Sequence, residues 1–386
     1  MNPRAMTPVK MLTPTALMLG NVVTGCTILA PAGMLVELSR DFGVTIREAS
    51  FLITFGAVVL CIGSPLSAAL TSRIDRRLLL AFSVAVMVIG NLASAFTTNF
   101  TVLMVLRIAT LAVAALYTPQ AAGTIGLLAP PEKRGGLIAY VFLGWSLAAA
   151  LGLPLISYIS SHYGWQFAFG GIGAFAAMCL VLLLVKLPRG VVGAPLDLKT
   201  WVSVLRNPLI LLLLVLTSLQ IGGQFVVYAF IGPLLAQLGK AGPEAIAVIF
   251  ATYGVAGFVG NIIASRVVDR WGPYRSSMVW MSALLIGASI WAVGAGFLSA
   301  MFIGVAIWGL GFASTNSMQQ VRLVGADPAA AGASVSLNTS FLYMGQGVGS
   351  AIGGALFERG MYIAQGYVSV AFIALAIGVL FLTRRG

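Results

Sequence analysis

One charged side chain lies within an apolar stretch where charge is costly. Arg107 is the only charged residue between Leu78 and Pro131. A guanidinium stays charged at any relevant pH, so it cannot act as a titrating base. It could bind an anionic or polar ligand, raise the acidity of a neighbour, or tether an adjacent helix through that helix's backbone. A purely structural arginine, satisfied by backbone carbonyls, is the alternative. Arg107 is therefore the first candidate for a functional site.

Amide, hydroxyl and aromatic side chains form a second set of candidates. Gln220, Gln224 and Tyr228 follow one another at spacings of four, which places them on one stripe of a helix. Similar groups lie in other apolar runs, namely Asn21, Thr24, Tyr117, Gln120, Trp308, Asn316, Gln319 and Asn338. Together they could hold a neutral or weakly charged amphipathic molecule, drug-like or sugar-like. Hydrogen bonding between helices is the alternative for each residue taken alone.

Groups that could exchange a proton are few. All ten acidic residues fall at the expected ends of apolar runs or between runs. Glu37 is the candidate nearest to Arg107, and a local pairing with Arg40 is its alternative. His162, the only histidine, titrates near neutrality but is expected in water outside the membrane. No cluster of metal ligands or catalytic partner for the histidine is evident, so neither a metal site nor an enzyme is expected.

The composition indicates the surroundings of these residues. Of 386 residues, 59% are hydrophobic and 8% charged, which leaves too little polar surface to cover a soluble globule. The formal net charge of +12 does not indicate nucleic-acid binding, because the basic residues punctuate the apolar runs instead of gathering in one patch. Cys26, Cys61 and Cys179 lie in apolar segments and are expected to be small packing residues. The chain is predicted to be an integral membrane protein.

Twelve apolar runs are long enough to cross a bilayer, for which about 20 helical residues are needed. An outer-membrane barrel is excluded, because its strands would be short and would alternate apolar with polar residues. The first six predicted spans are 12–36, 49–70, 78–96, 102–127, 136–160 and 165–187. The second six are 208–238, 243–267, 277–295, 300–321, 329–357 and 362–382. The predicted fold is all-α, with twelve transmembrane helices in two six-helix bundles.

Lysine and arginine predict the orientation. With a cytoplasmic N-terminus, seventeen basic residues face inside and only Arg40, Arg47, Lys240 and Arg359 face outside. This asymmetry predicts that both termini are cytoplasmic. The first run lacks a small-residue cleavage site and is expected to be an uncleaved span. No appended soluble domain is expected.

The longest polar connection divides the chain near its midpoint. We expect an N-terminal bundle over 1–187, a cytoplasmic linker over 188–207 and a C-terminal bundle over 208–386. Two halves with six spans each are typical of internally duplicated transporters. The segment 72–76 after the second span recurs in part as 265–270 after the eighth, which supports duplication.

Four stretches resemble one family. Ala68, Ser72, Arg73, Asp75, Arg76 and Arg77 partly match the loop motif Gly-x-x-x-Asp-Arg-x-Gly-Arg-Arg, and Asp269, Arg270 and Gly272 match its second copy. Leu103 and Arg107 match a fourth-span motif, and Gly144, Gly152 and Pro154 resemble an antiporter motif. On these residues the chain resembles the major facilitator superfamily. Within it, the chain is similar to the twelve-span drug:proton antiporters, in the neighbourhood of chloramphenicol-resistance and arabinose-efflux-like proteins.

The resemblance implies roles for particular residues. Arg73, Asp75, Arg76, Arg77, Asp269 and Arg270 would gate the inner mouth, and ordinary basic loops are the alternative. A solute pocket would lie between the halves, lined by spans one, four, seven and ten, with Arg107 facing it. Relatives commonly carry an acid in the first span where this chain has Ile28, so proton coupling stays open.

The expected function is export of a small molecule across a bacterial-type inner membrane by alternating access, with protons as a candidate coupling ion and a role in drug resistance. Facilitated diffusion or uptake is an alternative, and a transport-inactive sensor or assembly subunit is an alternative of another class. No ATP-binding signature is present and no cofactor is expected, so active transport would depend on an ion gradient. The expected partners are the solute and membrane lipids, and the family resemblance implies a monomer.

Overall fold

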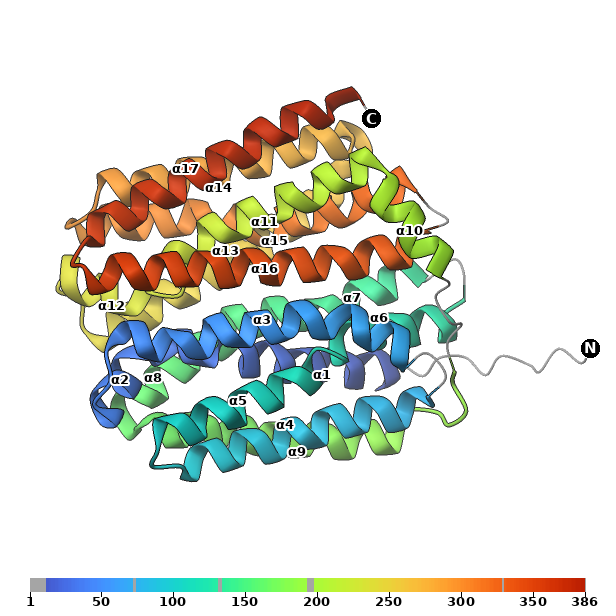
Figure 1. The fold of residues 1–386 in the computed structure, drawn as a ribbon, viewed down its shortest axis with the longest axis horizontal. Coiled ribbons are helices and arrows are strands. Elements are labelled where there is room, and N and C mark those ends of the chain that lie inside the picture. Colours follow the sequence, from blue (N-terminus) through green and yellow to red (C-terminus); the bar gives the residue numbers. More distant parts are fainter. Residues whose placement is uncertain (1–11, 72–73, 131–133, 193–197, 328–329, 386) are drawn as a thin grey trace, which may run out of the picture.

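The computed structural model describes residues 12–71, 74–130, 134–192, 198–327 and 330–385. Helices from residues 12–186, hereafter the N half, occupy the lower part of Figure 1, and those from residues 198–382, the C half, occupy the upper part. The long helices run side by side. The short helices α2 and α12 lie at one end of the molecule and α10 lies at the other, so we call these the α2/α12 end and the α10 end.

The helices follow the predicted spans closely. In the N half they are α1 (Leu12–Leu29), η1 (Ala30–Gly33), α2 (Leu35–Phe42), α3 (Ile46–Leu70), α4 (Arg76–Phe96), α5 (Phe100–Ala114), α6 (Tyr117–Leu128), α7 (Arg134–Leu147), η3 (Ala148–Gly152), α8 (Leu153–Tyr163) and α9 (Trp165–Lys186). In the C half they are α10 (Leu198–Arg206), α11 (Pro208–Tyr228), α12 (Ile231–Leu238), α13 (Pro243–Trp271), α14 (Pro273–Val293), α15 (Leu298–Ala326), α16 (Ala331–Glu358), α17 (Tyr362–Leu382) and η5 (Thr383–Arg385).

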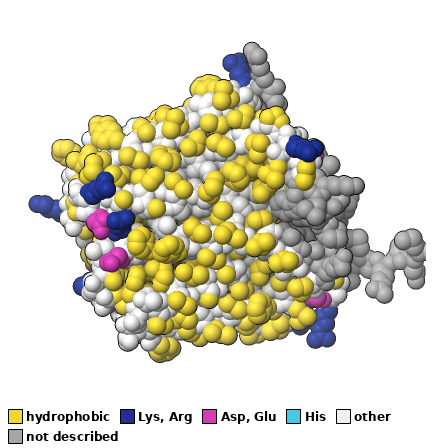
Figure 2. Space-filling model, viewed as in Figure 1, with side chains coloured by type: hydrophobic (Ala, Val, Ile, Leu, Met, Phe, Trp, Pro, Cys, Tyr) yellow, Lys and Arg dark blue, Asp and Glu magenta, His cyan; other side chains and the backbone are white. Residues whose placement is uncertain are grey.

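Eleven helical segments in the described residues are long and apolar enough to cross a membrane. The one predicted span missing from these eleven is 329–357, which corresponds to α16, a helix that is rich in glycine and serine and packs between α3 and α11. Figure 2 shows hydrophobic side chains over the middle of the visible face and charged side chains near its two ends. This pattern fits a bundle whose flank meets lipid and whose ends meet water.

Four predicted spans contain a break. The first, fourth and seventh divide into α1 and η1, α5 and α6, and α11 and α12, and the fifth contains the π-helical turn η3. A proline follows each break within a few residues: Pro31, Pro119, Pro154 and Pro233. Because proline has no N–H, the carbonyl four residues earlier loses its helical donor and the helix kinks or widens there. The breaks therefore have a cause in the sequence.

The halves pack mainly through two pairs of elements. α3 lies against α16, and α8 with η3 lies against α13. At the second crossing Gly254 is required, because a Cβ there would overlap the backbone of Ala150. One hydrophobic cluster spans the halves and includes Leu29 of α1 and Tyr228 of α11. The contact between the halves is thus a continuous apolar core.

Candidate functional site

Arg107 lies fully buried between four helices of the N half. From α5, its Nη2 donates to the carbonyl oxygen of Thr27 in α1, and its Nη1 donates to Oδ1 of Asn91 in α4 at 3.2 Å. Its Cζ lies 5.1 Å from the ring centroid of Phe169 in α9. In this conformation the guanidinium is enclosed by protein and does not face an opening. Of the roles predicted for Arg107, this geometry matches the tether to the first span.

The acceptor that Arg107 uses is explained by a proline. In a regular helix the carbonyl of Thr27 would accept from the N–H of residue 31, and residue 31 is proline. The carbonyl is therefore left without its helical donor where α1 gives way to η1. Asn91 supports the arrangement, because its Nδ2 donates to Oγ1 of Thr27 at 3.0 Å. Arg107 thus closes a buried network at the kink of the first span.

The other N-half candidates do not gather into one pocket. Asn21 accepts from Oγ1 of Thr118 at 2.8 Å, and Thr118 in turn accepts from Nε1 of Trp145 at 3.1 Å. Thr24 bonds within its own helix. Tyr117 is buried, donates to the carbonyl of Leu17 at 3.3 Å and crosses α1 at Gly20, so it is a packing residue here.

Candidates in the C half do meet. Oε1 of Gln224 accepts from Nε1 of Trp308 at 3.0 Å and from the hydroxyl of Tyr253 at 3.4 Å. Nε2 of Gln220 donates to Oδ1 of Asn316 at 2.8 Å. We call Gln220, Gln224, Tyr228, Tyr253, Trp308, Phe312 and Asn316 the amide–aromatic cluster. It joins α11, α13 and α15 through side chains that are buried or half-buried.

Aromatic rings form the apolar side of this cluster. The ring of Tyr228 lies 4.8 Å from that of Tyr253 and stacks on Phe312 at 6.4 Å. Tyr253 meets Trp308 edge to face at 5.6 Å. Amide groups beside aromatic faces form the combination that binds a molecule with both polar and apolar surface.

Several polar atoms near this cluster find no hydrogen-bond partner in the described part of the chain. They include Oε1 of Gln220, Oγ1 of Thr315, and both Nε2 and Oε1 of Gln319, all in buried side chains. Trp308, Thr315 and Gln319 lie seven and four residues apart, on one face of α15. Asn338 lies in α16 and accepts from Thr217 at 2.8 Å. The C half therefore presents donors and acceptors that its own fold leaves unused.

The predicted gating residues of the first half bond within that half. Asp75 caps α4 by accepting from the N–H of Arg77 at 2.8 Å and also accepts from the N–H of Gly190 at 2.5 Å. Arg77 donates to the carbonyl of Leu184. Arg76 donates to Oε1 of Gln120, which places Gln120 under this loop and away from the amide–aromatic cluster. Asp75 and Arg77 thus fasten the end of α9 to the start of α4, and the Arg76 side chain fastens α4 to α6.

The second loop is described only in part. Arg270 is exposed at the end of α13, and Gly272 follows with a φ of 77° and a ψ of 156°, a conformation essentially confined to glycine. Arg73 and the side chain of Asp269 lie outside the described residues. The gating role of these two residues stays a prediction.

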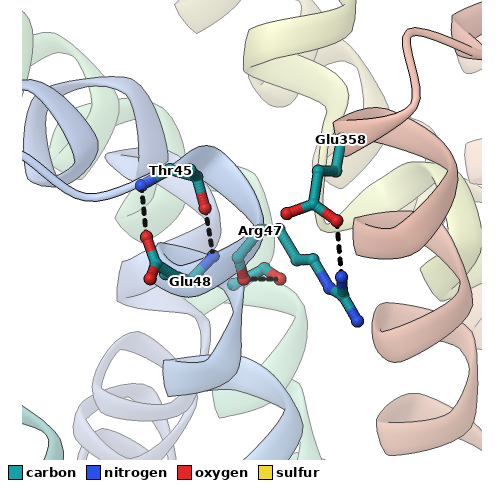
Figure 3. Close-up of polar contacts among 5 residues, drawn as sticks. Thr45, Arg47, Glu48 and Glu358 are labelled. Atoms are coloured by element: carbon teal, nitrogen blue, oxygen red, sulfur yellow. Dashed lines mark hydrogen bonds and ion pairs between the residues drawn. The ribbon is translucent and has the colours of Figure 1, made fainter.

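Side chains that were not candidates link the halves at the α2/α12 end. Nη1 of Arg47 in α3 bonds Oε2 of Glu358 in α16 at 2.5 Å, and Figure 3 shows the two side chains pointing toward each other. Thr45 and Glu48 bond each other's backbone N–H at the start of α3, which fixes the turn that carries Arg47. Deeper in the same interface, Thr54 donates to Ser350 at 3.1 Å.

The two coupling candidates both lie near this end. Nε2 of His162 in α8 is 3.2 Å from Oε1 of Glu244 in α13, which forms a second link between the halves. Glu37 lies half-buried in the first turn of α2. Burial raises the pKa of its carboxyl, and its own backbone N–H and the charge of Arg40 oppose that rise. Arg40 forms its hydrogen bond with Asp41, at 2.9 Å, and not the predicted local pair with Glu37.

Sequence reasoning missed Thr27, Asn91, Thr118, Trp145, Tyr253, Arg47 and Glu358. Asn91 could have been found, because it is the only amide side chain in α4. Thr27 could have been found from Pro31, because a proline has no N–H to donate to the carbonyl four residues earlier. Arg47 and Glu358 gave no such signal, since 311 positions separate them.

Comparisons with known proteins agree with this architecture. The sequence pattern of the Major Facilitator Superfamily matches residues 17–325. The inner membrane transport protein YdhP of Escherichia coli (strain K12) is 28% identical over 376 residues, covering 96% of this chain and 95% of that protein. A probable sugar efflux transporter of Mannheimia succiniciproducens is 25% identical over 358 residues, covering 92% of this chain and 89% of that protein.

Solved structures share the fold. The D-xylose-proton symporter superposes with a TM-score of 0.74 at 17% identity, covering 94% of this chain and 96% of that one. A bacterial homologue of the human lysosomal transporter Spinster, in an inward-facing and occupied conformation, superposes with a TM-score of 0.70 at 15% identity, covering 98% and 97%.

Proposed function

Because the chain belongs to the Major Facilitator Superfamily, and is therefore a multi-pass membrane protein that carries small molecules by secondary transport, we propose that it exports a neutral or weakly charged amphipathic solute. The proposed mechanism is alternating access between the N-terminal bundle, 1–187, and the C-terminal bundle, 208–386. The name of the Mannheimia succiniciproducens relative, a probable sugar efflux transporter, supports export over uptake. The alternatives of uptake, facilitated diffusion and a transport-inactive sensor remain outcomes of the test below.

The amide–aromatic cluster carries the proposal. Buried amide atoms without partners, at Gln220 and Gln319, can bond a solute's hydroxyl, carbonyl or amide groups. The rings of Tyr228, Tyr253 and Phe312 can cover its apolar surface. A cationic solute is disfavoured, because every acidic side chain that the structure describes lies at a helix end or between helices.

The orientation predicted from lysine and arginine indicates which side of the membrane the linked end of the bundle faces. With both termini cytoplasmic, the α2/α12 end is the periplasmic end, and Arg47–Glu358 and His162–Glu244 hold it closed. At the opposite end, Asp75, Arg76 and Arg77 bond inside the N half. We therefore assign the structure to a conformation closed toward the periplasm, from which a cytoplasmic solute would be loaded.

Glu37 is the carboxyl that we propose for proton coupling. Its raised pKa favours the protonated form more than that of an exposed glutamate would, and it lies beside the end that closes. Export driven by an inward proton gradient would need a carboxyl that both sides reach in turn. In proteoliposomes with an imposed pH gradient, the parent should respond to the gradient and Glu37→Gln should not. Transport that ignores the gradient in the parent would exclude antiport.

A thermal-shift screen of the purified full-length protein against sugars, nucleosides and neutral antibiotics tests the solute site. A solute at about 100 times its Kd should stabilise the folded state by about 3 kcal/mol. Gln224→Leu should abolish that shift, and Gln237→Leu, at an exposed position of α12, should retain it. A shift that survives in Gln224→Leu would place the solute elsewhere. No shift with any compound, together with no flux, would favour the sensor reading.

A further inference from the structure

Two links hold the halves together at the α2/α12 end, and they differ in chemistry. Arg47–Glu358 joins α3 to α16, and His162–Glu244 joins α8 to α13. A guanidinium stays charged at any relevant pH. An imidazole changes its charge between about pH 5 and pH 8. One of the two links can therefore respond to a proton and the other cannot.

The contacts of the histidine ring show what a second proton would add. Nδ1 of His162 lies 2.9 Å from the carbonyl oxygen of Tyr158, which can accept from it, and 3.0 Å from Oγ of Ser161, which can donate to it. A neutral ring can therefore satisfy only one side at a time: with its proton on Nδ1 it leaves Nε2 as an acceptor 3.2 Å from Oε1 of Glu244, and with its proton on Nε2 it bonds Glu244 but not Tyr158. A ring with both protons donates to Tyr158 and to Glu244 at once, and the bond to Glu244 becomes charge-assisted.

We propose that His162 and Glu244 form a proton-binding site on the periplasmic face that stabilises the closed end in acid. The second proton strengthens a link between the halves that exists only while α8 lies against α13. Proton binding and closure therefore favour each other. This proposal goes beyond the export function and needs no particular solute.

Among the described side chains of the packed elements, none that is charged, apart from Glu244, bonds the ring. Tyr158 stacks on it at 4.2 Å, Ser161 lies 3.0 Å from Nδ1, and Tyr163 lies 6.5 Å away, all from α8 itself. η1 and η3 carry no titratable side chain, and the only charged residue of α9, Lys186, is at its far end. On α13, Tyr253 is buried deeper, and Arg266, Asp269 and Arg270 lie near the opposite terminus. Glu244 is thus the charge that the ring meets.

The position of the site makes it a regulator and not the coupling group. In the closed state the His162 and Glu244 side chains are already 31% and 70% exposed at the α2/α12 end. Opening that end would expose them to the same water. A proton then enters and leaves on one side and none crosses the membrane, so external acid changes the rate of opening but supplies no driving force.

Distance measurements on the full-length protein in lipid nanodiscs test this idea. Spin labels at Gln166→Cys and Gln237→Cys, in a background without Cys26, Cys61 and Cys179, report on the separation of the halves at this end. Between about pH 8 and about pH 5.5, the closed population relative to the open one should rise about two- to fivefold, the size of an exposed ion pair.

Variants separate this site from other titrating groups. His162→Gln should hold the parent's alkaline distribution at both pH values, and His162→Lys should hold a closed-rich distribution at both. Arg47→Gln is the matched control, because it should lower the closed population at both pH values and keep the pH response. If His162→Gln does not fold, Glu244→Gln tests the same link and should also lose the response. A response that persists without His162 or Glu244, or none in the parent, overturns the proposal.

The side of the membrane is tested separately. Tyr163→Cys, exposed beside the site, should react with a membrane-impermeant thiol reagent added to intact spheroplasts. Labelling only after the membrane is broken would place the site inside. That result would overturn both the external assignment and the proposed orientation, and it would leave the solute site untouched.

Discussion

The two halves of the molecule bury polar groups in different ways. In the N half, Arg107, Asn91, Asn21 and Thr118 bond one another or the backbone in networks that cross α1, α4, α5, α6 and α7, although Nε of Arg107 has no partner among the described residues. In the C half, Gln220 keeps a free acceptor, and Gln319 keeps both donor and acceptor within the described part of the chain. A buried polar group without a partner costs about 1–3 kcal/mol. We therefore propose that the N half serves as a scaffold and that the C half holds in reserve the polar groups that bind the solute.

Arg107→Met should have the largest effect on this comparison. It leaves the carbonyl of Thr27 and Oδ1 of Asn91 without their donor, and we expect a loss of about 3 kcal/mol. Thermal unfolding of the purified protein measures it. Adding Pro31→Ala should recover part of the loss, because the new N–H can donate to Thr27. An additive double variant would contradict the account of this kink.

Gln224→Leu should come next. It removes the acceptor of Trp308 and Tyr253, so we expect a loss of about 2 kcal/mol and at least about tenfold weaker solute binding. Unfolding and titration calorimetry with a solute found by the screen measure the two effects. Unchanged solute affinity would show that the amide–aromatic cluster serves packing alone.

One substitution type should have opposite signs in the two halves. Gln319→Met removes two unpartnered buried atoms and should stabilise the free protein by about 1 kcal/mol. Gln120→Met, in the N half, removes bonds with Arg76 and Thr71 and should destabilise it by about as much. Thermal unfolding of the pair decides the comparison. If both variants are stabilised or both are destabilised, the proposed difference between the N half and the C half is contradicted.

On stability, Glu37→Gln should give the smallest effect, visible only in how the unfolding temperature depends on pH. Burial raises the folded-state pKa above the ordinary value of 4.5, so the unfolded chain ionises first as pH rises. Stability contributed by the protonated carboxyl is present below 4.5 and is lost as pH rises through the folded pKa. The variant should lack this decline, a difference of less than about 2 °C in Tm. If the unfolding temperatures of the parent and of Glu37→Gln depend on pH in the same way, the surroundings of Glu37 do not raise its pKa.

The sequence allowed the membrane fold to be predicted with span limits within a few residues, because apolar length and charge placement act locally. The short helix α12 was absorbed into the predicted span 208–238, and α2 was not predicted beyond its first two residues, although Pro31 and Pro233 marked the breaks. The stripe of Gln220 and Gln224 was predicted to share one face, and both residues lie in the amide–aromatic cluster.

What could not be predicted is which side chains meet across the bundle. Tyr117 and Gln120 are both polar residues of α6, yet Tyr117 packs on Gly20 and Gln120 bonds Arg76. Periodicity predicts which face of its helix a residue lies on. It does not predict how deeply that face is buried or which other helix packs against it. Arg107 was found from its charge alone, and its acceptor became clear only from the packing of α1 beside α5.

The tether of Arg107 bears on how the chain is assembled during synthesis. An arginine at mid-membrane disfavours insertion of its helix by about 2.5–3.5 kcal/mol. Both of its acceptors, Thr27 and Asn91, precede it in the chain and belong to helices that leave the ribosome first. The guanidinium thus reaches the bilayer after its partners. A circular permutant that begins at α5 would reverse that order and should insert this helix poorly.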